Sequence, residues 1–376
     1  MIKLFQKWCD QRHDYAREWK TRTGGKIFGT FCTYVPEEIL YAADILPVRV
    51  LGSHEPPDVA EPHILGMYCS FCRDVLAQGL KNRLEYLDGI TIGQSCLHLR
   101  QAYTSWDMHR PTAFSYYLPM PHNIQSERSY AFLESELEDF KAAVEEFIGK
   151  QITNEDLDRG IKIVNTNRRL LKQIFELRRQ DNPPITGLET MYLVLSSQLV
   201  DKRDHNKALE ELLEALPQRE LDRETGHRLM ILGSENDDTA FITMAEGLPI
   251  EAMFVIDDHC TGTRYFWNEC VPRENRLAAI AARYIERPPC PTKDWPVRKR
   301  ISHILEIADK WNVDGVVIIQ QKYCDPYELD IPAIKQALEE VGLPALFLEY
   351  DVAVPEGQFR IRVETFLEML ENEDLF

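Results

Sequence analysis

Nine cysteine residues give this 376-residue chain a large supply of thiols, and their positions indicate shared chemistry. Cys69 and Cys72 form a Cys-x-x-Cys pair in MYCSFCRD (residues 67–74), at a predicted turn from a strand in the apolar stretch 63–68 to a helix. Thiolates bind zinc or iron, and paired thiols can exchange disulfides. The six cysteines that belong to this pair or follow other predicted strands are Cys32, Cys69, Cys72, Cys96, Cys260 and Cys324.

The ends of parallel strands could bring these thiols together. In an open parallel sheet, residues just beyond the carboxyl ends of the strands face one crevice, and ligands bind there. Cys96 closes the predicted strand 88–96, Cys260 lies three residues beyond Asp257, and Cys324 directly follows VVIIQQKY. We therefore expect the six cysteines to point at one edge, up to four from one half of the chain and two from the other. The cysteines without such a placement are Cys9, Cys270 and Cys290.

The elements that must position these thiols alternate between strands and helices. Helical segments between apolar runs are typical of βαβ units and parallel sheets. A charged helical stretch separates an earlier from a later group of strands, and two of its helices open with capping boxes at Thr153 and Thr186. The predicted strands cover residues 27–31, 46–52, 88–96, 114–121, 228–234, 250–257, 313–320 and 344–351.

The fold class that follows is α/β, with two Rossmann- or flavodoxin-like parallel-sheet lobes, a helical segment and a cleft between the lobes. At 376 residues the chain is too long for one ordinary core. We place one lobe at residues 1–220, including a helical insertion at about 125–217, and the other at residues 221–376.

Four uses of the cysteines remain open at this point. A structural zinc site needs a second close pair of ligands, and Cys96-Leu-His98 is a poor one. A dithiol exchange site at Cys69 would leave the strand-end cysteines without a role. Free cysteines also serve as small buried apolar side chains. Iron–sulfur ligation by thiolates from several chain segments fits the number and the placement best.

Composition and missing motifs exclude several partners. The formal net charge of −18 argues against nucleic acid and against an anionic membrane surface, because both carry negative charge. The N-terminal stretch lacks the apolar core of a signal peptide and no apolar run has the length of a membrane span, so we expect a cytoplasmic protein. Neither a G-x-x-x-x-G-K-[ST] nor a G-x-G-x-x-G motif follows a strand, so a partner would have to bind any ATP.

Five stretches occur in the order and at the approximate intervals of one known family: FCTYVPEEILYAADILPVRVLGS, MYCSFCRD, the cysteine after DGITI, IDDHCTGTR and KYCDPYELD. With them the chain resembles the 2-hydroxyacyl-CoA dehydratase and benzoyl-CoA reductase family over essentially its whole length. The stretches SCLHLRQAYTSWDMH, FSYYLPMPH and NPPITGLE look most like the gamma (C-type) subunit of ATP-dependent (class I) benzoyl-CoA reductase.

The resemblance implies an iron–sulfur cluster in the cleft between the lobes. It also implies a paralogous beta-type subunit, activator subunits that hydrolyse ATP and carry their own [4Fe-4S] cluster, and ferredoxin as electron donor. The implied reaction is the ATP-driven reduction of benzoyl-CoA to cyclohexa-1,5-diene-1-carbonyl-CoA in anaerobic aromatic degradation. Alternatives are a 2-hydroxyacyl-CoA dehydratase subunit (a lyase with a ketyl-radical mechanism), a double-cubane-cluster reductase, and a subunit that only scaffolds its partner.

Carried over residue by residue, the resemblance favours some cysteines as ligands over others. A [4Fe-4S] cubane would leave some of them without a role, whereas the double-cubane [8Fe-9S] cluster of some relatives would use six. His259, His98 and Tyr323 are candidate proton donors only because they lie near these cysteines, and Arg264 could reach an anionic ligand or form a surface ion pair. The order of preference among the ligands is Cys69, Cys260 and Cys324, then Cys96, and last Cys72 and Cys32.

Overall fold

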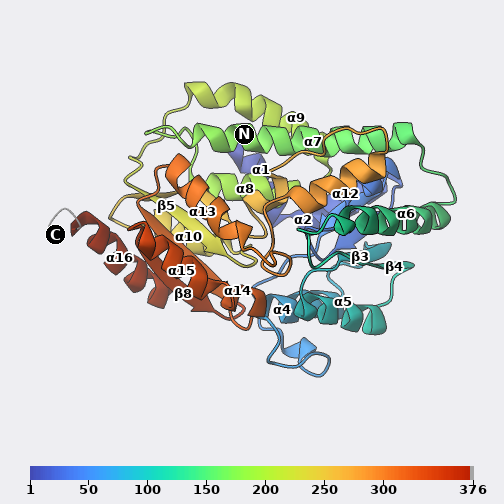
Figure 1. The fold of residues 1–376 in the computed structure, drawn as a ribbon, viewed down its shortest axis with the longest axis horizontal. Helices are drawn as coiled ribbons and strands as arrows, with labels where there is room; N and C mark the ends of the chain where they lie inside the picture. The colour runs from blue at the N-terminus through green and yellow to red at the C-terminus, as the bar shows by residue number, and fades with distance from the viewer. Residues whose placement is uncertain (373–376) are drawn as a thin grey trace.

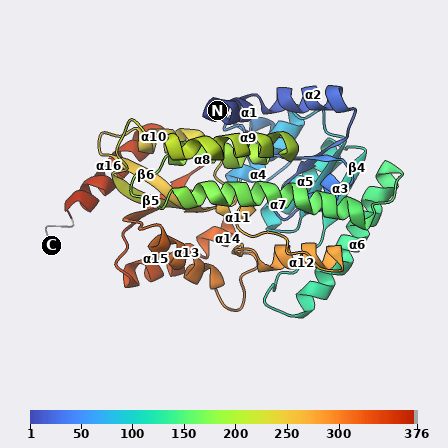
Figure 2. The same ribbon diagram turned by 90° about the horizontal axis from the view of Figure 1, so that it is seen from above.

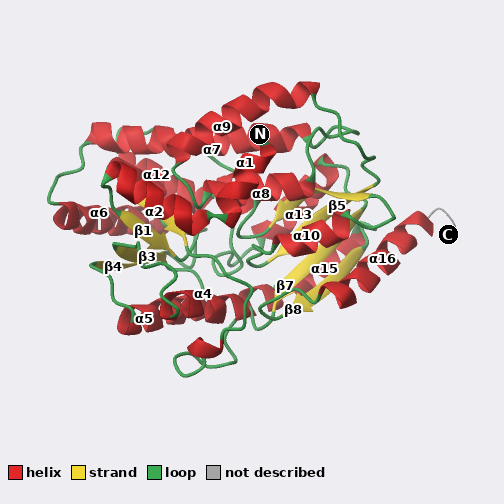
Figure 3. Ribbon diagram, turned by 180° about the vertical axis from the view of Figure 1, so that it is seen from behind, coloured by secondary structure: helices red, strands yellow, loops and turns green. Residues whose placement is uncertain are grey.

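Two four-stranded sheets, each built only of parallel strands, form the centre of the molecule (Figures 1 and 3). The computed structural model describes residues 1–372. Most strands are buried along their whole length, as parallel strands covered by helices on both faces must be. The predicted α/β class with two Rossmann- or flavodoxin-like lobes is therefore confirmed. The strands are β1 Ile27–Thr30, β2 Leu46–Arg49, β3 Gly89–Gly93, β4 Phe114–Leu118, β5 His227–Gly233, β6 Ala252–Asp258, β7 Gly315–Gln321 and β8 Ala345–Tyr350.

Both sheets have the same strand order, β2-β1-β3-β4 in the first and β6-β5-β7-β8 in the second. In each sheet the chain moves first to one side of its opening strand and then to the other. This reversal creates a switch point between β1 and β3, and another between β5 and β7. Ligands of open α/β sheets bind at the carboxyl ends of the strands at such points. Within about three residues of the ends of these four strands lie Cys32, Cys96, Ser234 and Cys324.

Helices cover both sheets, and α7 connects the two halves. It contacts α3 beside the first sheet and α11 and α12 of the C-terminal half, and Figure 2 shows it running lengthwise across the molecule. The helices are α1 Ile2–Asp10, α2 Arg12–Thr23, α3 Glu37–Ala42, α4 Ser70–Leu80, α5 Leu97–His109, α6 Arg128–Ile148, α7 Asn154–Leu177, α8 Gly187–Ser197, α9 Lys202–Ala215, α10 Thr239–Glu246, α11 Thr263–Phe266, α12 Arg276–Glu286, α13 Lys299–Lys310, α14 Asp325–Glu328, α15 Ile331–Glu340 and α16 Glu356–Asn372, with short 3₁₀ helices at Asp58–Ala60 and Leu216–Gln218.

The local predictions agree with the structure in most places. Both predicted capping boxes are present, with the side chains of Thr153 and Thr186 accepting backbone N–H groups at the starts of α7 and α8. One expectation is wrong, because the apolar stretch at residues 63–68 forms turns rather than a strand before Cys69. The division at residues 220 and 221 stays a prediction, and α12 from beyond it packs against α6 from before it. No helix within residues 1–372 is both long and apolar enough to cross a membrane.

Buried ion pairs and hydrogen bonds join α3 to elements from both halves. Glu38 forms an ion pair with Arg168 of α7 at 2.6 Å, and its carboxylate accepts a hydrogen bond from the hydroxyl of Tyr284 of α12 at 3.0 Å. The side chains of Glu38 and Arg168 are at most 3% exposed. Glu37 pairs with Lys202 of α9 at 3.1 Å. Although burial acts to raise the pKa of Glu38, the charge of Arg168 lowers it below its usual value. The carboxylates of Glu37 and Glu38 therefore act mainly as buried partners of cations. Their position at the start of α3 is their second role.

We expect Arg168→Ala to lower the free energy of unfolding by about 3–5 kcal/mol, because it leaves the Glu38 carboxylate buried without its charge partner. Denaturant unfolding of the full chain measures the loss. Arg17→Ala is the matched control, since it breaks an exposed pair with Glu85 at 2.7 Å and should cost less than about 1 kcal/mol. Equal losses in the two variants would contradict the stabilising role of the α3 network.

Candidate metal centre

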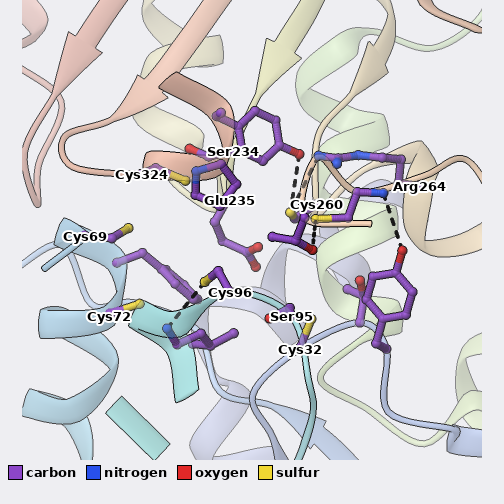
Figure 4. A pocket seen from close by; sticks show the side chains of 18 of the residues that line it. Cys32, Cys69, Cys72, Ser95, Cys96, Ser234, Glu235, Cys260, Arg264 and Cys324 are labelled. Atoms are coloured by element: carbon purple, nitrogen blue, oxygen red, sulfur yellow. Dashed lines mark hydrogen bonds between the residues drawn. The ribbon is translucent and has the colours of Figure 1, made fainter. Parts of the chain in front are cut away.

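Seven cysteines from both halves of the chain line one buried cavity of about 70 Å³ between the two sheets. The structure brings together all six cysteines that were predicted to point at one edge. Figure 4 shows the thiols of Cys69 and Cys72 on one side of the cavity with Cys324 above Cys69, Cys260 on the other side, and Cys96 between them. The seven lining cysteines are Cys32, Cys69, Cys72, Cys96, Cys260, Cys290 and Cys324.

Three of these cysteines sit at the starts of helices. Cys69, Cys96 and Cys324 are the N-cap residues of α4, α5 and α14. The partial positive charge of a helix N-terminus favours a thiolate over a thiol, and the Cys96 sulfur already accepts the backbone N–H of Leu99 at 3.4 Å. Tyr323 has a φ of 64°, an uncommon conformation for a bulky residue, directly before Cys324. The turns that begin α4, α5 and α14 thus place these three thiols at the cavity.

The remaining cavity cysteines come from one helix turn and three loops. Cys72 lies in the first turn of α4, and Cys32 follows β1. Cys260 lies between β6 and α11, and Cys290 lies between α12 and α13. Cys290 is the ligand candidate that the sequence analysis missed, because it follows a helix rather than a strand. Cys9 and Cys270, the other two set apart there, do not line this cavity.

The thiols influence one another in two groups. Hydrogen bonds from Cys324 and Cys72 lower the pKa of Cys69 well below its usual value. On the other side, burial raises the pKa of Cys260, Arg264 opposes that rise, and the neighbouring thiols of Cys290 and Cys32 add to it. Burial also raises the pKa of Cys96 to about 12. One group thus surrounds Cys69 and the other surrounds Cys260.

Three buried arginines give the cavity a positive lining although the whole chain is acidic. Arg264 donates to the Cys260 sulfur at 3.5 Å and pairs with Asp258 at 3.1 Å. Arg287 donates to the backbone oxygen of Thr33 at 2.8 Å. Arg49 pairs at 2.8 Å with Glu235, the one carboxylate among the described residues that lines the cavity. The cavity can therefore hold a negatively charged group, because buried cations offset the cost of taking its charge out of water.

Several buried polar atoms at the cavity have no partner among the described residues. They include Nε and Nη1 of Arg49 and the hydroxyl oxygen of Ser95, and these two side chains are only 4% and 7% exposed. A buried donor without an acceptor is costly and is rare in a native protein. These donors are available to a bound group that carries acceptor atoms, as the sulfurs of an iron–sulfur cluster are.

The donor set fits a polynuclear cluster better than a single ion. Within residues 1–372 no three His, Cys, Asp or Glu side chains stand close enough together to hold one metal ion, which argues against a preformed zinc site. Seven thiols spread around a cavity suit a larger inorganic group that is reached from several sides. The cysteines that would hold such a group are the seven cavity cysteines.

The three candidate proton donors occupy different places. His98 lies on a neighbouring cavity that shares Cys96 with this one. His259 is buried away from the thiols, where its Nδ1 lies 3.0 Å from the Thr261 hydroxyl, and burial lowers its pKa. Tyr323 is 38% exposed and does not line the cysteine cavity. A catalytic role for any of them stays a prediction.

His98 ties together three turns that carry cysteines. Its Nδ1 accepts the backbone N–H of Cys69 at 3.2 Å, and its Nε2 lies 3.2 Å from the carboxylate of Asp325, the neighbour of Cys324. His98 itself lies two residues after Cys96. One imidazole thus links the starts of α4, α5 and α14, which indicates that it positions the thiols.

We expect His98→Ala to lower the free energy of unfolding by about 1–3 kcal/mol, because a part-buried N–H loses its acceptor. It should also speed the alkylation of Cys69 in the metal-free chain, which peptide mass spectrometry measures. The control is His109→Ala on the same helix, where the imidazole contacts His63 at 3.1 Å and no cysteine turn. Unchanged Cys69 alkylation in His98→Ala would show that the imidazole does not position that turn.

Comparisons with known proteins identify the family of this chain. Residues 32–370 match the family model described as 2-hydroxyglutaryl-CoA dehydratase, D-component. The (R)-phenyllactyl-CoA dehydratase beta subunit of Clostridium sporogenes is 26% identical over 95% of this chain and 95% of its own length. The C-type subunit of benzoyl-CoA reductase from Thauera aromatica is 21% identical over 89% of this chain and 88% of its own. The putative dehydratase subunit YjiM of Escherichia coli K12 is 24% identical over 92% of each. Because the family model spans almost the whole length, this chain belongs to the 2-hydroxyglutaryl-CoA dehydratase D-component family.

Proposed function

We propose that the chain is the iron–sulfur subunit of an enzyme that transfers single electrons to a CoA thioester, with the cluster held in the seven-cysteine cavity. The observation that carries this proposal is the convergence of seven thiols from both halves with three buried arginines. When bound, an iron–sulfur cluster supplies and accepts single electrons, at a potential set by its charge, its hydrogen bonds and its exposure to solvent. The names of the relatives, all subunits of dehydratases or of a reductase, support the assignment.

The surrounding residues have definite tasks in this proposal. Arg49, Arg264 and Arg287 offset the negative charge of the thiolates and of the inorganic sulfides. The unpartnered Nε and Nη1 of Arg49 would be free to donate hydrogen bonds to a bound cluster, and such bonds would raise its reduction potential. The enclosed position between the sheets limits water, so that a reactive intermediate is not lost to hydrolysis or protonation.

We propose the double-cubane [8Fe-9S] type in preference to a single [4Fe-4S] cubane. A cubane uses about four thiolates, and this cavity offers seven. The grouping of Cys72 and Cys324 around Cys69, and of Cys32 and Cys290 around Cys260, would provide one set of ligands for each cubane. Cys96 lies between the two sets in Figure 4.

For the reaction we propose the reduction of benzoyl-CoA to cyclohexa-1,5-diene-1-carbonyl-CoA. The proposed partners are a paralogous beta-type subunit, ATP-hydrolysing activator subunits with their own [4Fe-4S] cluster, and ferredoxin. The long stretches similar to C-type subunits and the Thauera relative support this reaction. Dehydration of a 2-hydroxyacyl-CoA is the second candidate, which the Clostridium relative favours.

Iron and acid-labile sulfide analysis of the anaerobically purified chain tests the cluster. We expect about eight irons per chain, and about four in Cys290→Ala, because that variant removes one ligand of a single cubane set. Cys9→Ala is the control and should keep all its iron, since Cys9 does not line the cavity. About four irons in the unchanged chain would replace the double cubane with a single one, and none at all would sink the proposal.

Product analysis distinguishes the two reactions. The chain assembled with its paralogous subunit, activator, ATP and reduced ferredoxin should convert benzoyl-CoA with net consumption of reduced ferredoxin, and Cys260→Ala should abolish this conversion. The same assembly should leave (R)-phenyllactyl-CoA unchanged. Loss of water from phenyllactyl-CoA without net consumption of ferredoxin, and no turnover of benzoyl-CoA, would instead establish the dehydratase.

A further inference from the structure

A second cavity of about 420 Å³ adjoins the cysteine cavity, and we call it the antechamber. The two cavities share a wall that consists of Ser95, Cys96, Thr292 and Pro326. The antechamber is about six times as large as the cysteine cavity, and its volume falls in the usual range of small-molecule pockets. Cys96 is the one cysteine that lines both cavities, so it marks the passage between them.

The rim of the antechamber is apolar and open to solvent. Its residues Leu97, Trp295 and Leu329 are 62%, 65% and 73% exposed, an uncommon grouping of large apolar side chains around one opening. Pro291 and Pro326 add apolar surface inside. Such a surface favours a group that loses little hydration when it enters.

The charged residues of the antechamber are mostly acidic. Three aspartates line it against one arginine, Arg298. Asp330 forms ion pairs with Arg300 at 2.9 Å and Arg298 at 3.7 Å. Asp294 and Asp325 form no ion pair with a lysine or arginine within residues 1–372, so they leave uncompensated negative charge.

The two histidines on the antechamber are both engaged with neighbouring groups. Nδ1 of His98 accepts the Cys69 N–H. Nε2 of His122 accepts the side-chain amide of Gln94 at 2.8 Å, while its Nδ1 lies 3.4 Å from the Thr292 carbonyl oxygen. The antechamber thus has more acidic than basic side chains, whereas three buried arginines line the cysteine cavity behind it.

The shared wall also offers an unsatisfied donor. The Ser95 hydroxyl is buried, lines both cavities and has no partner among the described residues. Thr292 beside it is already engaged, since its hydroxyl donates to the Cys290 sulfur at 3.3 Å. A ligand that placed a carbonyl oxygen against Ser95 would satisfy this donor at the passage to the thiols.

We infer that the antechamber is the binding site for the uncharged, apolar end of an acyl thioester, with the thioester carbonyl at Ser95 and the phosphates outside the rim. This inference rests on the proposed function, which supplies the thioester. It adds where the ligand enters and which end enters first.

Iron release from the cluster-loaded full chain tests the access route. Neutral 2,2′-bipyridine should remove iron faster than the anionic bathophenanthroline disulfonate, and Leu329→Trp should slow bipyridine by filling the rim. Val341→Trp is the matched control, because Val341 is also exposed, at 59%, and lies outside the antechamber. Equal slowing in both variants, or faster release by the disulfonate, would overturn the inference.

Ligand protection tests the assigned end. Benzoyl-CoA should protect the iron from bipyridine in the unchanged chain, and free CoA should not. Ser95→Ala should weaken protection by benzoyl-CoA while retaining the same iron content. Protection by CoA alone, or none by benzoyl-CoA, would refute the assignment even where iron analysis upholds the cluster.

The access route can be tested even if the chain holds no iron, the result that defeats the proposed function. In that case the rate of labelling of Cys96 by N-phenylmaleimide, followed by peptide mass spectrometry, replaces iron release. Leu329→Trp should slow this labelling and Val341→Trp should not. Labelling that is equally fast in all three proteins would refute the antechamber as the route.

Discussion

The compensation of buried charge is the constraint on which the rest of the structure depends. Thiolates can gather in a dry cavity only where buried cations offset their charge, and buried cations in turn need partners of their own. Arg264 meets both needs, since it contacts the Cys260 sulfur and pairs with Asp258. Asp258 also pairs with Arg300 at 2.7 Å, and Arg300 pairs with Asp330. A chain of alternating charges thus runs from the thiols through the second half of the molecule to the wall of the antechamber.

The two sheets contribute to the site in the same way because they have the same strand order. Each sheet has a switch point, and a cysteine lies beyond the end of the strand on one side of it. These cysteines are Cys96 after β3 and Cys324 after β7. The two halves differ in the residues that follow the strand on the other side of the switch point. Cys32 follows β1 in the first sheet, and Ser234 and Glu235 follow β5 in the second. Arg49 at the end of β2 pairs with Glu235 across the gap, so the joint between the halves is also a wall of the cavity.

The parts of the site that follow from strand topology could be predicted from the sequence. Cys96, Cys260 and Cys324 come directly after apolar runs, and the rule for parallel sheets predicts where such residues gather. Cys290 could not be found in this way, because it reaches the cavity only through the packing of α12 against α6 and α7, a contact between distant segments. Arg49 lies within a predicted strand, and nothing in that position predicts a place at the cavity. Arg264 is buried because it pairs with Asp258 in the folded second half. The strand predicted at residues 63–68 is absent because apolar content alone does not distinguish a strand from a packed loop.

The placement of one cavity between two halves has a consequence for how the protein matures. A group held by residues 32–96 and by residues 260–324 acts as a cross-link between segments that are far apart along the chain. Whatever binds the joined halves and not the open chain adds its binding energy to their association. A group bound there would therefore favour the closed molecule, and chains without it would open more readily and be degraded sooner.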